Sequence, residues 1–147
     1  MEYRITKEEL GNDWLYSTLV ALDKCMAEHG LPLYVVGARA RDVAMKLIQE
    51  LSDYIEEEIN DAIKYVKLAM EIRDEYPNVA ENIYKISEEE MKHMSILHTQ
   101  VASVIEDYRR KNGDPPEAMK MLYDIMHRKH IEHAAEARAY QAMYKGQ

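Results

Sequence analysis

Hydrophobic and polar positions alternate with a helical period along most of the chain. Apolar side chains recur every three or four positions from Trp14 to Met26 and again between about residues 38 and 144, which is the spacing of one helix face. Glycine and proline interrupt the pattern after Gly30, at Pro77 and within 112–116. The pattern predicts four helices, near 7–29, 40–76, 79–111 and 115–144. Because the connections at 77–78 and 112–116 are short, the predicted fold is an all-α antiparallel helical bundle.

One stretch departs from the helical period. Residues 31–37 are Leu-Pro-Leu-Tyr-Val-Val-Gly, a short, apolar and β-branched run that is typical of a strand. A strand needs a partner, and the chain offers none, so we expect at most a short extended segment here. The sequence predicts two domains, and this segment belongs to the first. Residues 1–44 form an N-terminal helix and connection, and residues 45–147 form the helical domain.

The predicted helix near 79–111 carries polar residues within its apolar stripe. That stripe consists of Ile83, Ile86, Leu97, Val101, Val104 and Tyr108. At ~100° per residue, Glu90 and His93 lie within roughly 40° of its centre. Residues three apart share one helix face, so the carboxylate and the imidazole point the same way. Polar groups at core positions are costly without partners, and such violations gather at functional sites.

Two other helices place similar residues on their inner faces. Glu58 lies within ~50° of the centre of the 40–76 stripe. His130 and His133 lie in the stripe of the last helix. Counting from the turns places Glu58 within ~9 Å of Glu90 along the bundle axis, and His130 within ~5 Å of His93.

A metal site explains this set of residues. The predicted ligands are Glu58, Glu90, His93, His130 and His133, with His127 and Glu136 as alternatives on the last helix. Carboxylate and imidazole together suit iron, and also manganese or zinc. A second interpretation needs no metal, because the same side chains can form a buried polar network that fixes the register of the bundle.

The helix pair at about 51–97 resembles the ferritin-like superfamily, especially rubrerythrin-like proteins with a carboxylate-bridged pair of metal ions. The resemblance consists of Glu58, Tyr65, Tyr76-Pro77 and the run Ile86-Ser87-Glu88-Glu89-Glu90-Met91-Lys92-His93. The family pattern repeats Glu and Glu-x-x-His on a second helix pair, whereas this chain has no second Glu-x-x-His. The resemblance implies iron binding, with oxidation or storage of the metal. It also implies that a homodimer supplies the second half of the site.

A shorter stretch, about 21–42, resembles the opening segment of nucleotidyltransferase-type domains. It contains Tyr34-Val35-Val36-Gly37 followed by Arg41-Asp42, which matches a strand, a glycine turn and the start of a helix. The aspartates that bind metal in that family have no counterpart, since no Asp-x-Asp follows in the chain. We therefore carry no nucleotidyl transfer over to this chain.

Charge and composition narrow the range of partners. The 147 residues carry a net charge of −8, whereas a surface that binds nucleic acid needs a basic excess. No apolar run approaches the ~20 residues of a membrane-spanning helix. The one cysteine, Cys25, cannot form a disulfide within the chain, and no signal peptide is apparent, so we expect a cytoplasmic protein. Two hypotheses remain: a metal-binding protein, and a non-enzymatic protein that works by helical association.

Overall fold

The structure, a computed structural model of the chain, describes residues 34–146, with side chains from Arg39 onward. Contacts divide the chain into two compact units, Met1–Ala44 and Met45–Gln147. The bundle is described from Met45 onward. The predicted helix near 7–29 and the first residues of the predicted extended segment, 31–33, lie outside the described residues.

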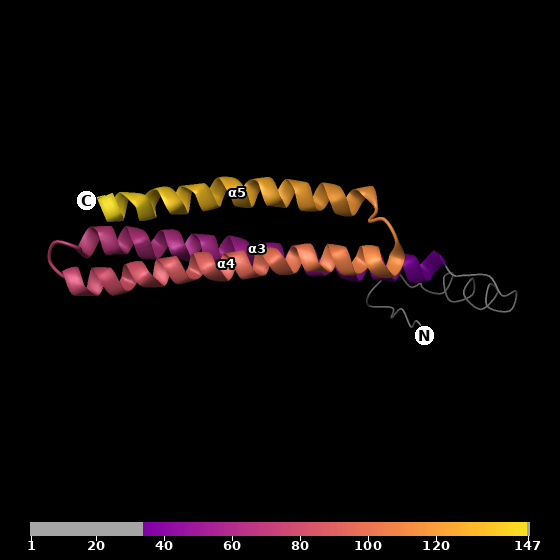
Figure 1. The fold of residues 1–147 in the computed structure, drawn as a ribbon, viewed down its shortest axis with the longest axis horizontal. Helices are drawn as coiled ribbons and strands as arrows, with labels where there is room; N and C mark the ends of the chain where they lie inside the picture. Colours follow the sequence, from indigo (N-terminus) through magenta and orange to yellow (C-terminus); the bar gives the residue numbers. More distant parts are fainter. Residues whose placement is uncertain (1–33, 147) are drawn as a thin grey trace, which may run out of the picture. The chain divides into compact units, whose positions relative to one another are not determined.

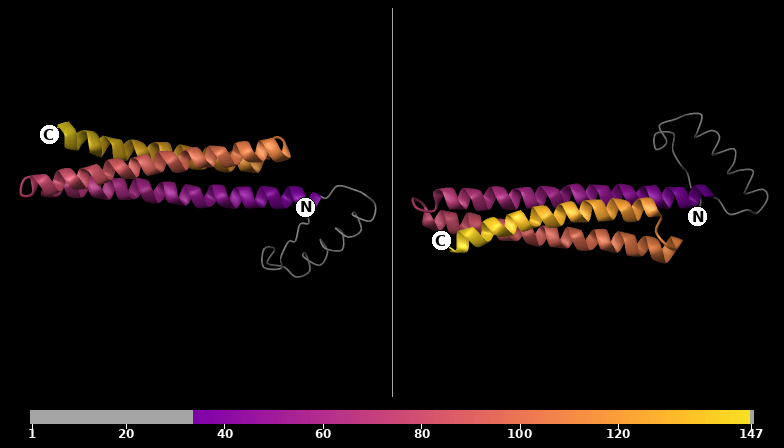
Figure 2. Two further views of the ribbon diagram at one scale, coloured as in Figure 1. Left: turned by 60° about the horizontal axis from the view of Figure 1, so that its bottom comes forward. Right: turned by 90° about the horizontal axis from the view of Figure 1, so that it is seen from above.

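Three helices make up the described chain: α3 (Tyr34–Ile72), α4 (Pro77–Asn112) and α5 (Glu117–Gly146). In Figures 1 and 2, α4 runs back beside α3, and α5 runs back along the same pair. No strand occurs between residues 34 and 146. The prediction of an all-α antiparallel bundle is therefore confirmed. Among these helices, none combines the length and the apolar character that crossing a membrane requires.

The connections follow from local chemistry. Pro77 occupies the first turn of α4, where its missing N–H costs nothing because that donor would have no partner within the helix. The Ala80 N–H then donates to the Tyr76 carbonyl at 2.9 Å. At the other end of α4, Gly113 adopts a φ of 89°, a left-handed value that favours glycine. Its N–H donates to the Arg109 carbonyl at 2.9 Å and closes the helix.

Three sequence-based boundaries need correction. Residues 34–37 are helical and form the start of α3. A β-branched run that has no partner strand adopts the helical conformation of the residues after it. The helix α3 ends at Ile72, four residues before the predicted end. Pro77 starts α4, although we expected it to lie in the turn before the helix.

The core of the bundle uses small and flexible side chains as well as branched ones. Its buried residues include Ile48, Ile55, Ile59, Ala62 and Val66 of α3, Ala80, Tyr84, Ser87, Met91 and Met94 of α4, and Met119, Ala134 and Ala137 of α5. On α4 this buried face is rotated by roughly 80° from the predicted stripe. Of the six predicted stripe residues of α4, only Val101 is buried, and the others are partly exposed. Thus α4 carries two adjoining apolar faces, and the chain itself covers one of them.

Candidate metal centre

Three of the predicted ligands meet where α3 and α4 run side by side. The His93 Nδ1 lies 2.9 Å from Glu90 Oε2 and 3.5 Å from Glu58 Oε2. Each of the three side chains offers one ligand atom, and these atoms all lie within 4.8 Å of one another. In the described part of the chain, no other group of three or more His, Cys, Asp or Glu side chains meets this condition. The helical spacing of three aligns Glu90 with His93, and the antiparallel pairing of α3 with α4 brings Glu58 to them.

The charges of this cluster are arranged to hold a cation or a proton. Partial burial raises the pKa of the Glu58 carboxyl. Glu90 raises this pKa further through a hydrogen bond and repulsion, while His93 opposes the shift. The hydrogen bond to Glu90 raises the pKa of the His93 imidazole, and the charge of Glu58 adds to the effect. A metal ion would stabilise the two mutually repelling carboxylates as anions, and the imidazole beside them could also bind it.

The cluster lies at the edge of the bundle, away from its centre. The side chains are 17% exposed for Glu90, 28% for Glu58 and 56% for His93. The predicted stripe placed His93 further inside. The difference arises because the inner face of α4 is centred on Ser87, Met91 and Met94, so that His93 falls at its margin. The cluster is consequently open to solvent or to a second molecule.

The two predicted histidines of α5 lie on the opposite side of α3. His130 is buried. Burial lowers the pKa of the His130 imidazole, although Glu56 opposes this. The His133 Nδ1 lies 3.0 Å from Glu56 Oε1, but the pair lacks hydrogen-bond geometry, and neither this nitrogen nor Glu56 Oε2 has a hydrogen-bond partner. Within one chain, therefore, His130 and His133 do not join Glu58, Glu90 and His93.

The two alternative ligands of α5 also lie elsewhere. Glu136 is exposed. His127 contacts His98 of α4, with 2.7 Å between its Nδ1 and the His98 Nε2. Neither residue belongs to the group that contains Glu90. Whether any of the α5 residues binds metal stays a prediction.

Sequence reasoning missed Glu56 and His98. Glu56 is not among the predicted site residues, but Lys129 and His133 of α5 both approach its carboxylate. A signal was present, because Glu56 lies four residues after the buried Ser52 and so shares its face. His98 lies four residues after Met94 and three before Val101, both of which are buried. This spacing could have placed His98 on the inner face of α4.

Comparisons with known proteins add no further constraint on the site. No family model matches this chain, and no curated protein and no solved structure matches it either. The functional argument therefore rests on the geometry of the described residues.

Proposed function

We propose that the chain binds a metal ion through Glu58, Glu90 and His93. The observation that carries the proposal is the convergence of two carboxylates and one imidazole, from two helices, with their ligand atoms within 4.8 Å. Two carboxylates and one imidazole form an oxygen-rich donor set, which suits iron and manganese, and also accepts zinc. Iron is the metal we favour, in agreement with the ferritin-like resemblance of the same three residues. Bound iron would supply redox chemistry toward dioxygen or peroxide, as metal oxidation and storage require.

The surroundings of the three residues support a second part of the proposal, a symmetric homodimer. Three ligands leave positions open on an ion that takes up to six. Apolar side chains that the chain leaves partly exposed lie within about three helical turns of the cluster. They are Leu51, Tyr54, Tyr65 and Leu68 of α3 and Ile86, Leu97 and Val104 of α4, here called the open face.

A two-fold axis through the open face would bring two copies of Glu58, Glu90 and His93 together. The partner chain would then supply the carboxylates and the imidazole that a second helix pair supplies in the ferritin-like pattern. The same contact would cover apolar side chains that water otherwise surrounds, and burial of apolar surface drives association. On this proposal, metal binding and dimer formation strengthen each other.

A non-enzymatic role in helical association is the second candidate. It is favoured by the contacts that the three side chains already make with one another. His93 bonds to Glu90 and lies against Glu58, so each polar group has a partner without a metal ion. Under this proposal the cluster is a polar network that sets the register of a protein interface.

Substitution of Glu90 separates the two candidates. The full chain is freed of metal, loaded with Fe²⁺ without oxygen and assayed for bound iron, melting temperature and sedimentation. If the metal proposal holds, the wild type binds iron and sediments as a dimer, and Glu90→Ala abolishes iron binding while the helix persists, since alanine favours helix. Glu89→Ala is the matched control, because Glu89 is its exposed neighbour outside the cluster.

The opposite results are equally clear. Iron content that Glu90→Ala leaves unchanged removes Glu90 from the site. A wild type that binds no iron, yet melts well above Glu90→Ala, favours the polar network, since the change leaves His93 without its main partner at a cost of roughly 1–3 kcal/mol. A chain that stays monomeric at micromolar concentration with iron bound overturns the dimer and leaves the metal site in place.

A further inference from the structure

A pair of histidines joins α4 to α5 at a place that the proposed iron site does not use. The His98 Nε2 lies 2.7 Å from the His127 Nδ1. The ring of Tyr123 stacks on that of His127, with 5.2 Å between centroids and 10° between planes. This stacking limits the rotation of the His127 ring. The His98 and His127 nitrogens, which come from different helices, thus lie closer together than two nitrogen ligands of one metal ion would lie.

A third imidazole lies in the same surroundings. A hollow of about 340 Å³ is lined by Met94, Ser95, His98, His127 and His130, among others. A second, much smaller hollow is also lined by His98, His127 and His130. The nitrogens of His98, His127 and His130 do not all lie within 4.8 Å of one another, so His130 borders the hollow without completing a set of three ligands.

The protonation of the histidines suits a ligand role. Burial and the neighbouring His127 lower the pKa of the His98 imidazole, and burial lowers that of His130. Both rings are therefore neutral at neutral pH, which is the form that binds metal. Arg138 also lines the larger hollow, so its charge favours an anionic or water ligand on the exposed side of an ion.

We propose that His98 and His127 form a second site that binds a late divalent transition metal such as Zn²⁺, with water completing the ligand shell. Imidazole nitrogens select zinc and copper, whereas the carboxylates of the first site suit iron and manganese. Tetrahedral zinc with Zn–N bonds of ~2.05 Å separates two nitrogens by ~3.3 Å. The rings of His98 and His127 must then part by only ~0.6 Å. One ring also shifts its proton to its other nitrogen, so that no net proton is released.

The test uses the full chain carrying Glu90→Gln, so that the carboxylate site is disabled and only other sites bind. Zn²⁺ affinity is measured by competition with a chromophoric chelator. Cu²⁺ is added in parallel, because its electron paramagnetic resonance spectrum reports the number of nitrogen ligands. Adding His98→Gln or His127→Gln should weaken zinc binding at least about a hundredfold, since even partners outside the ligand shell cost 10–100-fold. Each change should also lower the nitrogen count of bound copper.

His133→Gln is the matched control, because His133 lies on α5 near His130 but faces Glu56. It should leave zinc affinity and nitrogen count unchanged. Circular dichroism without metal checks that each variant folds, and having two ligand variants guards against the failure of one. Zinc affinity that neither His98→Gln nor His127→Gln alters overturns the second site. This result is independent of the iron site, which is tested by comparing the wild type with Glu90→Ala.

Discussion

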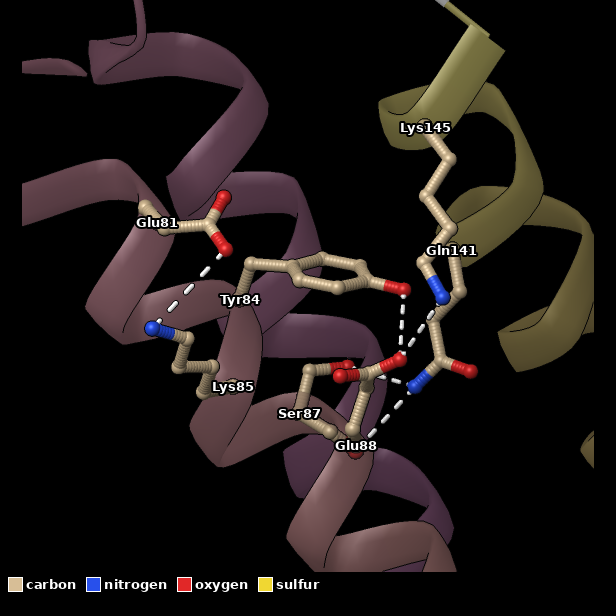
Figure 3. Close-up of polar contacts among 7 residues, drawn as sticks. All are labelled: Glu81, Tyr84, Lys85, Ser87, Glu88, Gln141 and Lys145. Carbon is tan, nitrogen blue, oxygen red and sulfur yellow. Dashed lines mark hydrogen bonds and ion pairs between the residues drawn. The ribbon is translucent and has the colours of Figure 1, made fainter. Parts of the chain in front are cut away.

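Ser87 and Glu90 lie one helical turn apart on α4, and both are polar, yet their surroundings differ. Ser87 is 0% exposed and donates a hydrogen bond of 2.7 Å to the Ala62 carbonyl of α3. It also accepts one of 2.9 Å from the Gln141 side chain of α5. Figure 3 shows Gln141 reaching across from α5 to Ser87. Glu90 pairs with His93 of its own helix and interacts with Glu58 of α3.

The difference is whether the third helix covers the residue. Around Ser87, three helices enclose the polar atoms, and each atom finds a partner within the chain, as buried polar groups require. Nearby, the rings of Tyr84 and Tyr144 stack with 4.4 Å between centroids, which ties α4 to α5. Around Glu90, only two helices meet, and the carboxylates are left to share an imidazole. We call the surroundings of Ser87, Tyr84 and Tyr144 the covered region. We infer that the covered region specifies the fold and that the open face is available for function.

The largest effect should come from placing the same apolar residue at both positions. Ser87→Leu replaces the hydroxyl oxygen with three carbons at a fully buried position and removes the hydrogen bonds to Ala62 and Gln141. We expect the free energy of unfolding to fall by about 2–4 kcal/mol. Glu90→Leu adds an apolar group to a partly exposed margin and should change it by less than about 1 kcal/mol. Urea denaturation of the metal-free proteins measures both values.

The comparison fails if the two substitutions cost the same. Equal large losses of stability would mean that Glu90 is as enclosed as Ser87. Equal small losses of stability would mean that the structure around Ser87 rearranges to accommodate leucine. Leu has a good helix propensity at both positions, so helix formation itself does not explain a difference.

The fold could be predicted from the sequence because its signals are local. Long runs with a helical period, together with Pro77 and Gly113, predicted the ends of the three described helices to within six residues. The exact face of α4 could not be predicted in this way. Large aliphatic residues marked the open face, whereas the buried face uses Ala80, Ser87 and Met94, which a hydrophobic pattern weights less. Tertiary packing decided between two plausible faces.

The candidate site was predictable within a helix and less so between helices. The spacing of Glu90 and His93 fixed their common direction, and the antiparallel turn brought Glu58 close. Counting residues from the turns gives the depth of a side chain along the bundle axis, but it does not show which side of α3 a neighbouring helix occupies. His130 and His133 were therefore grouped with Glu90 and His93, which lie on the other side of α3. His98 was overlooked because its partner, His127, lies 29 residues away on another helix.

The two regions should also respond to pH in opposite directions. Glu58 has a pKa raised above 4.5 and His93 a pKa raised above 6.5. Each holds its proton more tightly in the folded chain, so stability should fall as pH rises through these raised values. Glu88 lies beside the covered region, and its hydrogen bond with Lys145 lowers its pKa below 4.5. Its contribution is present above 4.5 and is lost as pH falls through the lowered value.

Denaturation of the metal-free chain between pH 3 and 8 checks this opposition. Glu58→Gln should flatten the decline above pH 4.5, and Glu88→Gln should flatten the loss at lower pH, since each removes one titrating carboxyl. Stability that rises with pH because of Glu58 would show that this carboxyl is stabilised as an anion without metal, contrary to the arrangement of charges described for the open face.

The smallest effect should come from the rim of the covered region, where charge rather than packing links α4 to α5. Lys145 Nζ lies 2.9 Å from Glu88 Oε1 and 5.5 Å from the centroid of the Tyr84 ring. The Lys145 side chain is 64% exposed and that of Glu88 37%, so the pair gains little from Coulomb attraction and salt screens it. Lys145→Gln should give a slight loss of stability at low ionic strength that disappears at about 1 M salt.

The matched control is Lys64→Gln, which breaks an exposed pair with Asp61 within α3 and should have a similarly slight effect. A loss with Lys145→Gln that persists at high salt would mean that packing on Tyr84, rather than charge, links the helices at this rim.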